Sequence, residues 1–371
     1  MIYLDHAATT PVRDEVLADM LPYFSQSFAN ASSGYSQARE SRRAIDCARG
    51  EVADLIGANR SEIYFTSGGS ESDNWALLGA AAAQPAKKHI ITTKVEHHAV
   101  LHTCQALERR GYEVTYLGVD SMGRVLLKEF EEAIRPDTLM ASVMLANNET
   151  GTIQPIRELS CIAHAYGIMM HTDAIQAVGH IPVNVADLDV DMLSVSAHKF
   201  GGPKGIGALY VKCGVRLEKL IYGGAQERNM RAGTENTPAI VGMGKAAVLS
   251  SRCMQQESAH VMALRDDLER KLLRIKGIRV NGDRTNRLPG HLHVSIGQAN
   301  KTLLLMQVDL EGIAVSAGSA CSSGAAIRSH VIEAMGLASD GQADIRFSIA
   351  AQNTTEEIDK TVTAIRRILK R

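Results

Sequence analysis

A lysine flanked by polar residues and glycines stands out in residues 194–205. This segment reads as a strand that ends in Ser196, followed by His198, Lys199 and a glycine-rich loop. A lysine at the end of a strand, facing a crevice and partly desolvated, can bind a carbonyl cofactor as a Schiff base. Ser196 and His198 offer hydrogen-bond donors to a nearby phosphate. Taken alone, the segment also fits a surface lysine beside a turn.

A second strand end carries Asp173 and Gln176. A carboxylate at this place can pair with a protonated pyridine nitrogen, which turns such a ring into an electron sink. Gln176 can hydrogen-bond to an oxygen on the same ring. A helix cap is the alternative interpretation of Asp173.

A third strand end, in residues 66–74, leads through glycines into a helix that begins near Gly69 and Ser70. Free backbone N–H groups and the helix dipole make this an anion site, although the spacing of a Walker motif is absent. An ordinary turn fits the same residues. Asn148 follows an apolar strand and can donate to a ring substituent, or it forms part of a turn.

Three histidines, His97, His98 and His102, lie close together in the sequence. His98 and His102 are one helical turn apart, so a zinc site is geometrically possible, but no acidic or thiol third ligand is obvious. We therefore predict no metal site. The alternative is that one imidazole stacks on a flat ring.

Cys321 lies in residues 316–324, which contain only Gly, Ala, Ser and Cys. Small neighbours leave a thiol uncovered, and an uncovered thiol indicates a functional cysteine. The other five cysteines are predicted to be buried or incidental thiols. Arg346 lies on a predicted strand, and its guanidinium suits a carboxylate bidentately, although a surface arginine is the plainer interpretation.

The elements that position these residues alternate between strand-like and helix-like segments, which predicts a mostly parallel α/β sheet with helices on both faces. We expect a large domain at 16–250, and a smaller α+β domain formed by 1–15 and 251–371. The 371 residues are 45% hydrophobic with a net charge of −1, which excludes disorder and general nucleic-acid binding. With no apolar run of membrane length and no CxxC pair, we expect a cytoplasmic protein with reduced thiols and no membrane contact.

Taken together, these segments resemble the pyridoxal-phosphate-dependent cysteine desulfurases, a group of class-V aminotransferases. The resemblance covers nearly the whole chain, from residues 3–11 to the segment around Arg346, and the Cys321 loop has the form of the first group. It implies a fold-type I transferase with a seven-stranded sheet in the large domain. The motifs that carry it are residues 66–74, 95–98, 147–151, 171–176, 196–199, 223–227, 231–234 and 319–321.

The resemblance also implies a role for each matching residue. Lys199 would bind pyridoxal 5′-phosphate covalently and take the substrate Cα proton, and Cys321 would be the nucleophile. Arg346 would bind the substrate carboxylate, with Asn148 beside the ring. His97 would stack on the ring and act as an acid or base. The remaining cofactor contacts would come from Asp173 and Gln176 on the ring, from Gly69, Ser70, Ser196 and His198 on the phosphate, and from Thr234 on the phosphate of the partner subunit.

The implied reaction converts L-cysteine to L-alanine and leaves a persulfide on Cys321 for an acceptor protein, either a cluster scaffold or a tRNA-thiolation enzyme. The active unit would be a homodimer. Two departures from the family stand out: Ala29 and Ala31 with Tyr35 near the expected entrance, and Ala350-Ala351 where the family often has Gly-Arg. The alternatives are a selenocysteine lyase or aminotransferase of the same fold, and a non-catalytic sulfur-relay protein.

Overall fold

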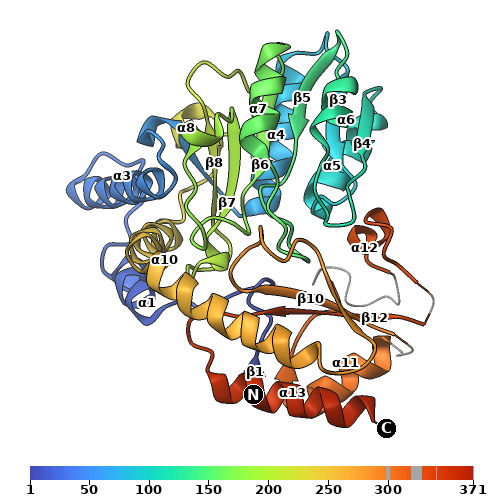
Figure 1. The fold of residues 1–371 in the computed structure, drawn as a ribbon. Helices are drawn as coiled ribbons and strands as arrows, with labels where there is room; N and C mark the ends of the chain where they lie inside the picture. Colours follow the sequence, from blue (N-terminus) through green and yellow to red (C-terminus); the bar gives the residue numbers. More distant parts are fainter. Residues whose placement is uncertain (298–300, 319–327, 340, 371) are drawn as a thin grey trace.

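A seven-stranded sheet forms the centre of the computed structural model, which describes residues 1–297, 301–318, 328–339 and 341–370 (Figure 1). Its order is β2-β8-β7-β6-β5-β3-β4, and only β8 runs antiparallel to its neighbours. This confirms the predicted mostly parallel sheet. The strands are β2 (Ile63–Thr66), β3 (His89–Thr93), β4 (Glu113–Leu117), β5 (Thr138–Ser142), β6 (Met169–Asp173), β7 (Met192–Ser196) and β8 (Gly207–Val211).

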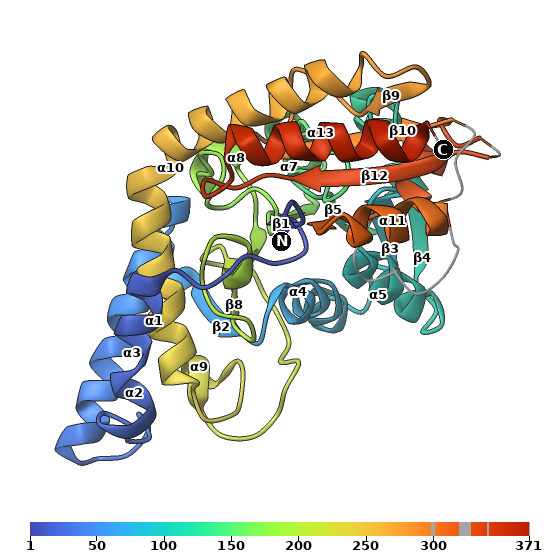
Figure 2. The same ribbon diagram turned by 90° about the horizontal axis from the view of Figure 1, so that it is seen from below.

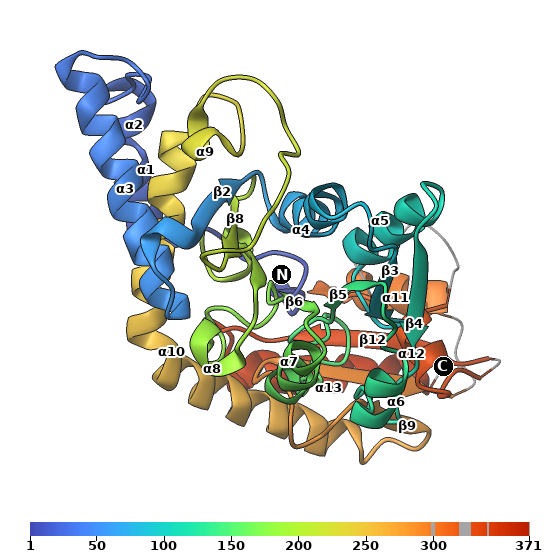
Figure 3. The ribbon, with the colours of Figure 1, turned by 90° about the horizontal axis from the view of Figure 1, so that it is seen from above.

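Both faces of this sheet are covered by helices, as Figure 3 shows for α4 (Gly69–Ala83) and α5 (His98–Glu108) on one side and α7 (Ile156–Ala165) on the other. Successive strand residues enter opposite cores: Ile91 packs with the α7 side, and Ile90 packs with the α4 side. Side chains alternate along a strand, so a strand covered twice must be apolar at both kinds of position.

A second, three-stranded antiparallel sheet has the order β12-β10-β9 (Figure 2). It shares an apolar core with α13 (Thr355–Leu369), which also takes in Leu4 from the N-terminal segment. The N-terminal strand pairs with β11, so the first residues belong structurally to this smaller sheet layer. The elements are β1 (Ile2–Tyr3), β9 (Ile278–Asn281), β10 (His291–Ile296), α11 (Lys301–Leu310), β11 (Ile313–Ala314), α12 (His330–Ala334) and β12 (Ala343–Ser348).

One long helix, α10 (Thr237–Leu272), joins the two sheet layers (Figure 1). The sequence pattern predicted a helix over 259–275, so its start was wrong. Asn236 caps the true start by accepting a hydrogen bond from the backbone N–H of Ala239. The expected domain boundary at 250 falls inside this helix, whose first half packs into the larger core and whose second half packs into the smaller one. The division into domains stays a prediction.

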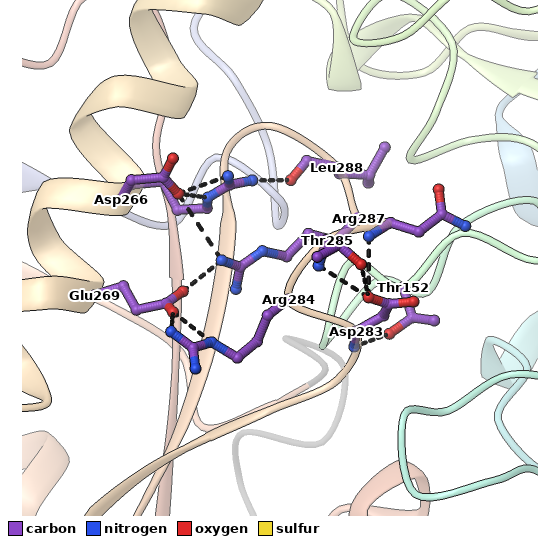
Figure 4. A network of polar contacts seen from close by, with 10 residues as sticks. Thr152, Asp266, Glu269, Asp283, Arg284, Thr285, Arg287 and Leu288 are labelled. Carbon is purple, nitrogen blue, oxygen red and sulfur yellow. Dashed lines mark hydrogen bonds and ion pairs between the residues drawn. The ribbon is translucent and has the colours of Figure 1, made fainter.

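A buried polar network attaches the smaller layer to the larger one (Figure 4). In it, Arg265 donates to the carbonyl of Leu288 at 3.1 Å, and Arg287 forms an ion pair with Glu269. The backbone N–H of Leu288 then donates to the carbonyl of Gly151 at 2.9 Å. The loop over residues 282–290 therefore rests on the turn that carries Asn148.

All but one of the remaining elements are short. They are α1 (Asp14–Met20), α2 (Pro22–Ser25), α3 (Ser36–Ile56), η1 (Arg60–Glu62), α6 (Leu127–Glu132), α8 (Val185–Leu188), η2 (Ala197–Lys199) and α9 (Gln226–Asn229), of which only α3 exceeds two turns. Within the described ranges, every helix is too short or too polar to cross a membrane.

Candidate active site

A cavity of about 190 Å³ opens where β2, β6 and β7 end and the N-terminal segment crosses them. The crevice at the carboxyl ends of parallel strands is the usual ligand site of such sheets. Of the predicted site residues that the structure describes, all but Thr234 line it. The lining residues are Ala7, Ala8, Gly69, Ser70, His97, Met144, Asn148, Asp173, Ile175, Gln176, Ser196, His198, Lys199 and Arg346.

Lys199 reaches this cavity from the short helical turn η2 directly after β7. Its Nζ donates to the carbonyls of Ala7 and Ala8, at 2.6 and 3.0 Å. Thr10 fixes the crossing segment by donating to the carbonyl of His198 from both its backbone N–H and its hydroxyl. The sequence predicted the lysine, but gave these backbone acceptors no role, although residues 7 and 8 belong to the N-terminal motif.

Asp173 ends β6 with only 4% of its surface exposed. Its Oδ1 accepts a hydrogen bond from the backbone N–H of Ile175 at 2.9 Å. Burial raises the pKa of Asp173 to about 6, against the lowering effect of that N–H and of Lys199. A buried carboxyl in this state is stabilised by any cationic N–H that enters the cavity. Gln176 lies beside it and donates to the carbonyl of Ala7.

His97 is the N-cap of α5, and its Nδ1 accepts the backbone N–H of Ala99 at 3.1 Å. An accepting Nδ1 assigns the proton of the neutral ring to Nε2. Burial and the neighbouring charge of Lys199 lower the pKa of His97 to about 4. The structure thus places a flat, neutral imidazole at the cavity wall, as the stacking prediction requires.

The other histidines of this region form a stack outside the cavity. The ring of His98 lies 4.9 Å from the rings of both His102 and His330. Over the part of the chain that the structure describes, no cluster of His, Cys, Asp and Glu has the arrangement of a metal site.

The glycine-rich end of the cavity lies at the start of α4, where Gly69 and Ser70 present backbone N–H groups that the helix itself leaves unpaired. A Cβ on Gly69 would lie 2.0 Å from Cδ1 of Ile175, so any larger residue here would require the Ile175 side chain to move. Ser196 and His198 face the same space, and the Nδ1 of His198 lies 3.1 Å from the hydroxyl of Thr9. This is a cradle for a small anion.

Arg346 lies on β12 and is 1% exposed, so it is not the surface arginine of the plainer interpretation. One terminal nitrogen donates to the carbonyl of Asn148 at 2.9 Å, and the other donates to Asp5 at 2.7 Å. Each of these nitrogens carries a second N–H. Within the described residues, Nε of Arg346 and Oδ1 of Asn148 are buried without a hydrogen-bond partner. Asp5 is a positioning residue that the sequence did not reveal.

A second layer of buried acids lies behind the cavity and was also missed. Asp73 on α4 is fully buried, 3.8 Å from Nε2 of His171. Burial, together with the charge of Asp173, raises the pKa of Asp73 well above its ordinary value. Burial likewise raises the pKa of Glu96 to about 8. Neither acid has a clear sequence signal, because each has polar neighbours in the sequence, Ser72 and Asn74 around Asp73 and His97 after Glu96.

One predicted residue that the structure describes lies apart from the cavity. Thr234 is exposed and does not line it. Cys321 lies outside the described residues. Of the other five cysteines, Cys104 is buried, Cys253 is partly buried, and Cys47, Cys161 and Cys213 are exposed, so the expectation of buried or incidental thiols stays a prediction.

Comparisons with known proteins agree with this geometry. The aminotransferase class-V family model matches residues 2–361. The chain is 48% identical to cysteine desulfurase IscS of Methanosarcina thermophila, across 100% of the chain and 92% of that protein. It is 49% identical to cysteine desulfurase IscS of Dictyoglomus turgidum, across 100% of the chain and 95% of that protein.

Solved structures give the same result. A NifS-like protein superposes with a TM-score of 0.94 at 38% identity, covering 100% of this chain and 99% of that one. A structure described as SspA in complex with cysteine has a TM-score of 0.84 at 38% identity, covering 95% of this chain and 100% of that one. With a family model across residues 2–361 and full-length relatives near half identity, the chain belongs to the class-V aminotransferases, among their cysteine desulfurases.

Proposed function

We propose that this protein is a cysteine desulfurase that takes sulfur from L-cysteine, releases L-alanine and holds the sulfur as a persulfide on Cys321. One observation carries the proposal: a single cavity brings together the amine of Lys199, the buried carboxyl of Asp173 and the guanidinium of Arg346. An amine for a carbonyl, an acid for a ring nitrogen and a cation for a carboxylate are what a pyridoxal-dependent reaction on an amino acid requires.

The residues present fit pyridoxal phosphate. The cradle at Gly69 would hold the phosphate and Lys199 the aldehyde, and the buried carboxyl of Asp173 gains a cationic partner when it faces a pyridinium nitrogen. His97 would cover the ring. When bound, the cofactor supplies an electron sink next to the substrate Cα.

Side chains of the protein would bind the substrate and transfer its protons. Arg346 binds the substrate carboxylate through N–H groups that Asn148 and Asp5 leave available. The amine of Lys199 would take the Cα proton of the substrate at its Nζ atom. Neutral His97 has its Nε2–H directed away from the helix cap, so it can donate a hydrogen bond at the cavity.

Cys321 completes the reaction by attacking the substrate sulfur as a thiolate. An S–S bond forms as the substrate C–S bond breaks, so L-cysteine and the enzyme thiol become L-alanine and an enzyme persulfide. No outside oxidant is needed. A sulfur-acceptor protein then takes the outer sulfur, and we propose a homodimer in which Thr234 reaches the phosphate bound in the partner subunit.

The purified protein tests this proposal directly. We expect visible absorption from a bound chromophore that changes on adding L-cysteine, with sulfide released in the presence of a reductant. Lys199→Ala abolishes both signals, whereas Cys321→Ala keeps the chromophore and loses sulfide. Mass mapping after borohydride reduction should find a pyridoxyl adduct on Lys199, and its absence would overturn the assignment.

A further inference from the structure

The residues just before Thr234 adopt an unusual backbone. Glu227, Arg228 and Asn229 have φ values of 46°, 56° and 64°, three successive non-glycine residues in the left-handed region. Each such residue carries backbone strain, which persists only where surrounding contacts impose the conformation. The segment therefore has to be held from outside.

Glu227 supplies the first of these contacts. It is 4% exposed and accepts two hydrogen bonds from Arg49 of α3, at 2.6 and 2.8 Å. Its Oε2 also accepts the backbone N–H of Phe65 at 2.9 Å. Arg228 donates to the carbonyl of Ile63 at 2.7 Å. The left-handed turn is thus bound to β2, the edge strand that leads directly into the phosphate cradle.

Arg231 supplies the second contact. Its guanidinium binds Glu71 in the first turn of α4 bidentately, at 2.8 and 3.0 Å. Burial alone would raise the pKa of Glu71, but hydrogen bonds from Arg231 and Ser67 more than offset this, so the pKa is lowered. Arg231 therefore neutralises an ionised carboxylate that stands next to the anion cradle and would otherwise repel a phosphate there.

Glu235 supplies the third contact, on the other side of Thr234. Its side chain is 2% exposed and lies 3.2 Å from Arg42, which stands two turns before Arg49 on the same face of α3. Thr234 lies between Arg231 and Glu235 and is exposed. The exposed threonine is thus held on both sides by arginine–carboxylate pairs that reach back into its own subunit.

We propose that Glu227 and Arg231 are positioning residues that fix the Thr234 segment (residues 230–236), so that each subunit presents Thr234 to the cofactor phosphate of its partner. The inference rests on the homodimer proposed above. The ion pairs that hold this segment also contact β2 and α4, which lead into the phosphate cradle. The cradle of one subunit therefore helps to position the threonine that contacts the phosphate in the other subunit.

Mixed dimers test it in trans. One chain, the acceptor, keeps Lys199, while the other, the donor, carries Lys199→Ala together with the variant under test. Pyridoxal phosphate is titrated onto the apo mixed dimers, borohydride fixes what is bound to Lys199, and mass spectrometry counts the pyridoxyl adduct. Only acceptor sites are counted, so any change reports what the donor presents across the interface.

We expect Thr234→Ala in the donor to raise the concentration for half-labelling about tenfold, as for the loss of one hydrogen bond to a charged group. Glu227→Gln and Arg231→Gln in the donor should each raise it by a similar factor, and Arg231→Lys should raise it less. Adding Thr234→Ala to Glu227→Gln should cause no further loss. Because Arg231 is partly exposed, its variants are expected to fold, and they test the inference even if Glu227→Gln does not fold.

Glu311→Gln in the donor is the control, because it breaks a carboxylate–arginine pair with Arg367 of α13, in the smaller layer, that has no part in the segment or the cavity. It should leave acceptor labelling within twofold of the parent. The inference is overturned if the Glu227 and Arg231 variants match this control while Thr234→Ala does not, or if their effects add to that of Thr234→Ala. If Thr234→Ala itself leaves acceptor labelling unchanged, both the cross-subunit contact and this inference are wrong. Sulfide release by the unmixed enzyme would still report desulfurase function.

Discussion

At the scale of single residues, Asp173 makes the sharpest chemical prediction. Asp173→Asn keeps the shape and the hydrogen bond from Ile175 but removes the charge that a pyridinium nitrogen needs. Losing one partner of a buried ionic pair costs about 3 kcal/mol, so sulfide release should fall about 100-fold while Lys199 remains labelled. Asp189→Asn, at an exposed pair with Lys212, is the control and should keep full activity. Equal rates for the two variants would contradict this role.

Glu96 predicts how stability varies with pH. Its carboxyl accepts hydrogen bonds from Thr93 and the backbone of Met144, yet burial raises its pKa to about 8. The folded chain therefore keeps a proton that the unfolded chain loses near its ordinary pKa. Between these two values stability falls as pH rises, by up to about 1.4 kcal/mol per pH unit.

Glu96→Gln should remove this slope. The free energy of unfolding, measured in urea at pH 5 and pH 8, should fall less for Glu96→Gln than for the unaltered protein. Glu108→Gln, on the exposed face of α5, should retain the original slope. An unchanged slope in Glu96→Gln would show that Glu96 is already ionised in the folded chain.

The chemistry of the site could be predicted from sequence because its residues follow strand ends. Asp173 is the last residue of β6 and Lys199 lies three residues after the end of β7, where parallel strands bring side chains to one edge. Their partners could not be predicted in the same way. Arg346 binds Asp5, 341 positions away, and no local pattern couples such residues. Thr234 was named through the family motif alone, and the single chain does not bring it to the cavity.

At the scale of elements, the contact between β8 and the phosphate cradle depends on Gly207. A Cβ there would lie 2.6 Å from the carbonyl oxygen of Val195 and 2.8 Å from backbone atoms of Gly68, and neither strand nor cradle can move away cheaply. Gly207→Ala should cost about 1–3 kcal/mol of unfolding free energy and weaken cofactor binding.

Gly50 offers the matched control, because it lies inside α3 with open space where a Cβ would go. Gly50→Ala should stabilise the protein by up to about 1 kcal/mol, since alanine is the better helix former. Urea unfolding measures both variants, and a cofactor titration measures the cradle. If Gly207→Ala binds the cofactor as well as Gly50→Ala does, the cradle does not depend on this close contact.

The strands of the large sheet were predictable because most of them are buried between two helix layers and are rich in apolar and β-branched residues. The start of α10 was not. Its first half is rich in Ala, Gly and Ser and lacks a charged face, because it is buried between α3 and the sheet. Amphipathic periodicity appears only after residue 258, where the helix gains an exposed side. Hydrophobic periodicity identifies a helix only where one face of the helix is exposed to solvent.

At the scale of the whole molecule, the larger and the smaller sheet layers are connected by the helix α10 and by the polar network of Figure 4. The first half of α10 belongs to the larger core and the second half to the smaller one. Between them, the network of Figure 4 holds the loop over residues 282–290 against the turn that carries Asn148. Arg346 reaches the same turn from β12. The substrate side of the cavity is therefore built from both layers and keeps its shape only while they stay docked.

Glu269→Gln tests this docking. The change leaves Arg287, which is 7% exposed, with only the longer contact of 3.9 Å to Asp266, and weakening a buried ion pair in this way costs up to about 3 kcal/mol. We expect urea unfolding to shift to lower denaturant by that free energy, and limited proteolysis to cut the 282–290 loop faster. Arg367→Gln breaks the more exposed pair with Glu311 and should change stability by about 0.5 kcal/mol or less. If the two variants lower the free energy of unfolding equally, the polar network contributes no more stability than a surface ion pair. The packing of α10 against the two cores must then hold the layers together.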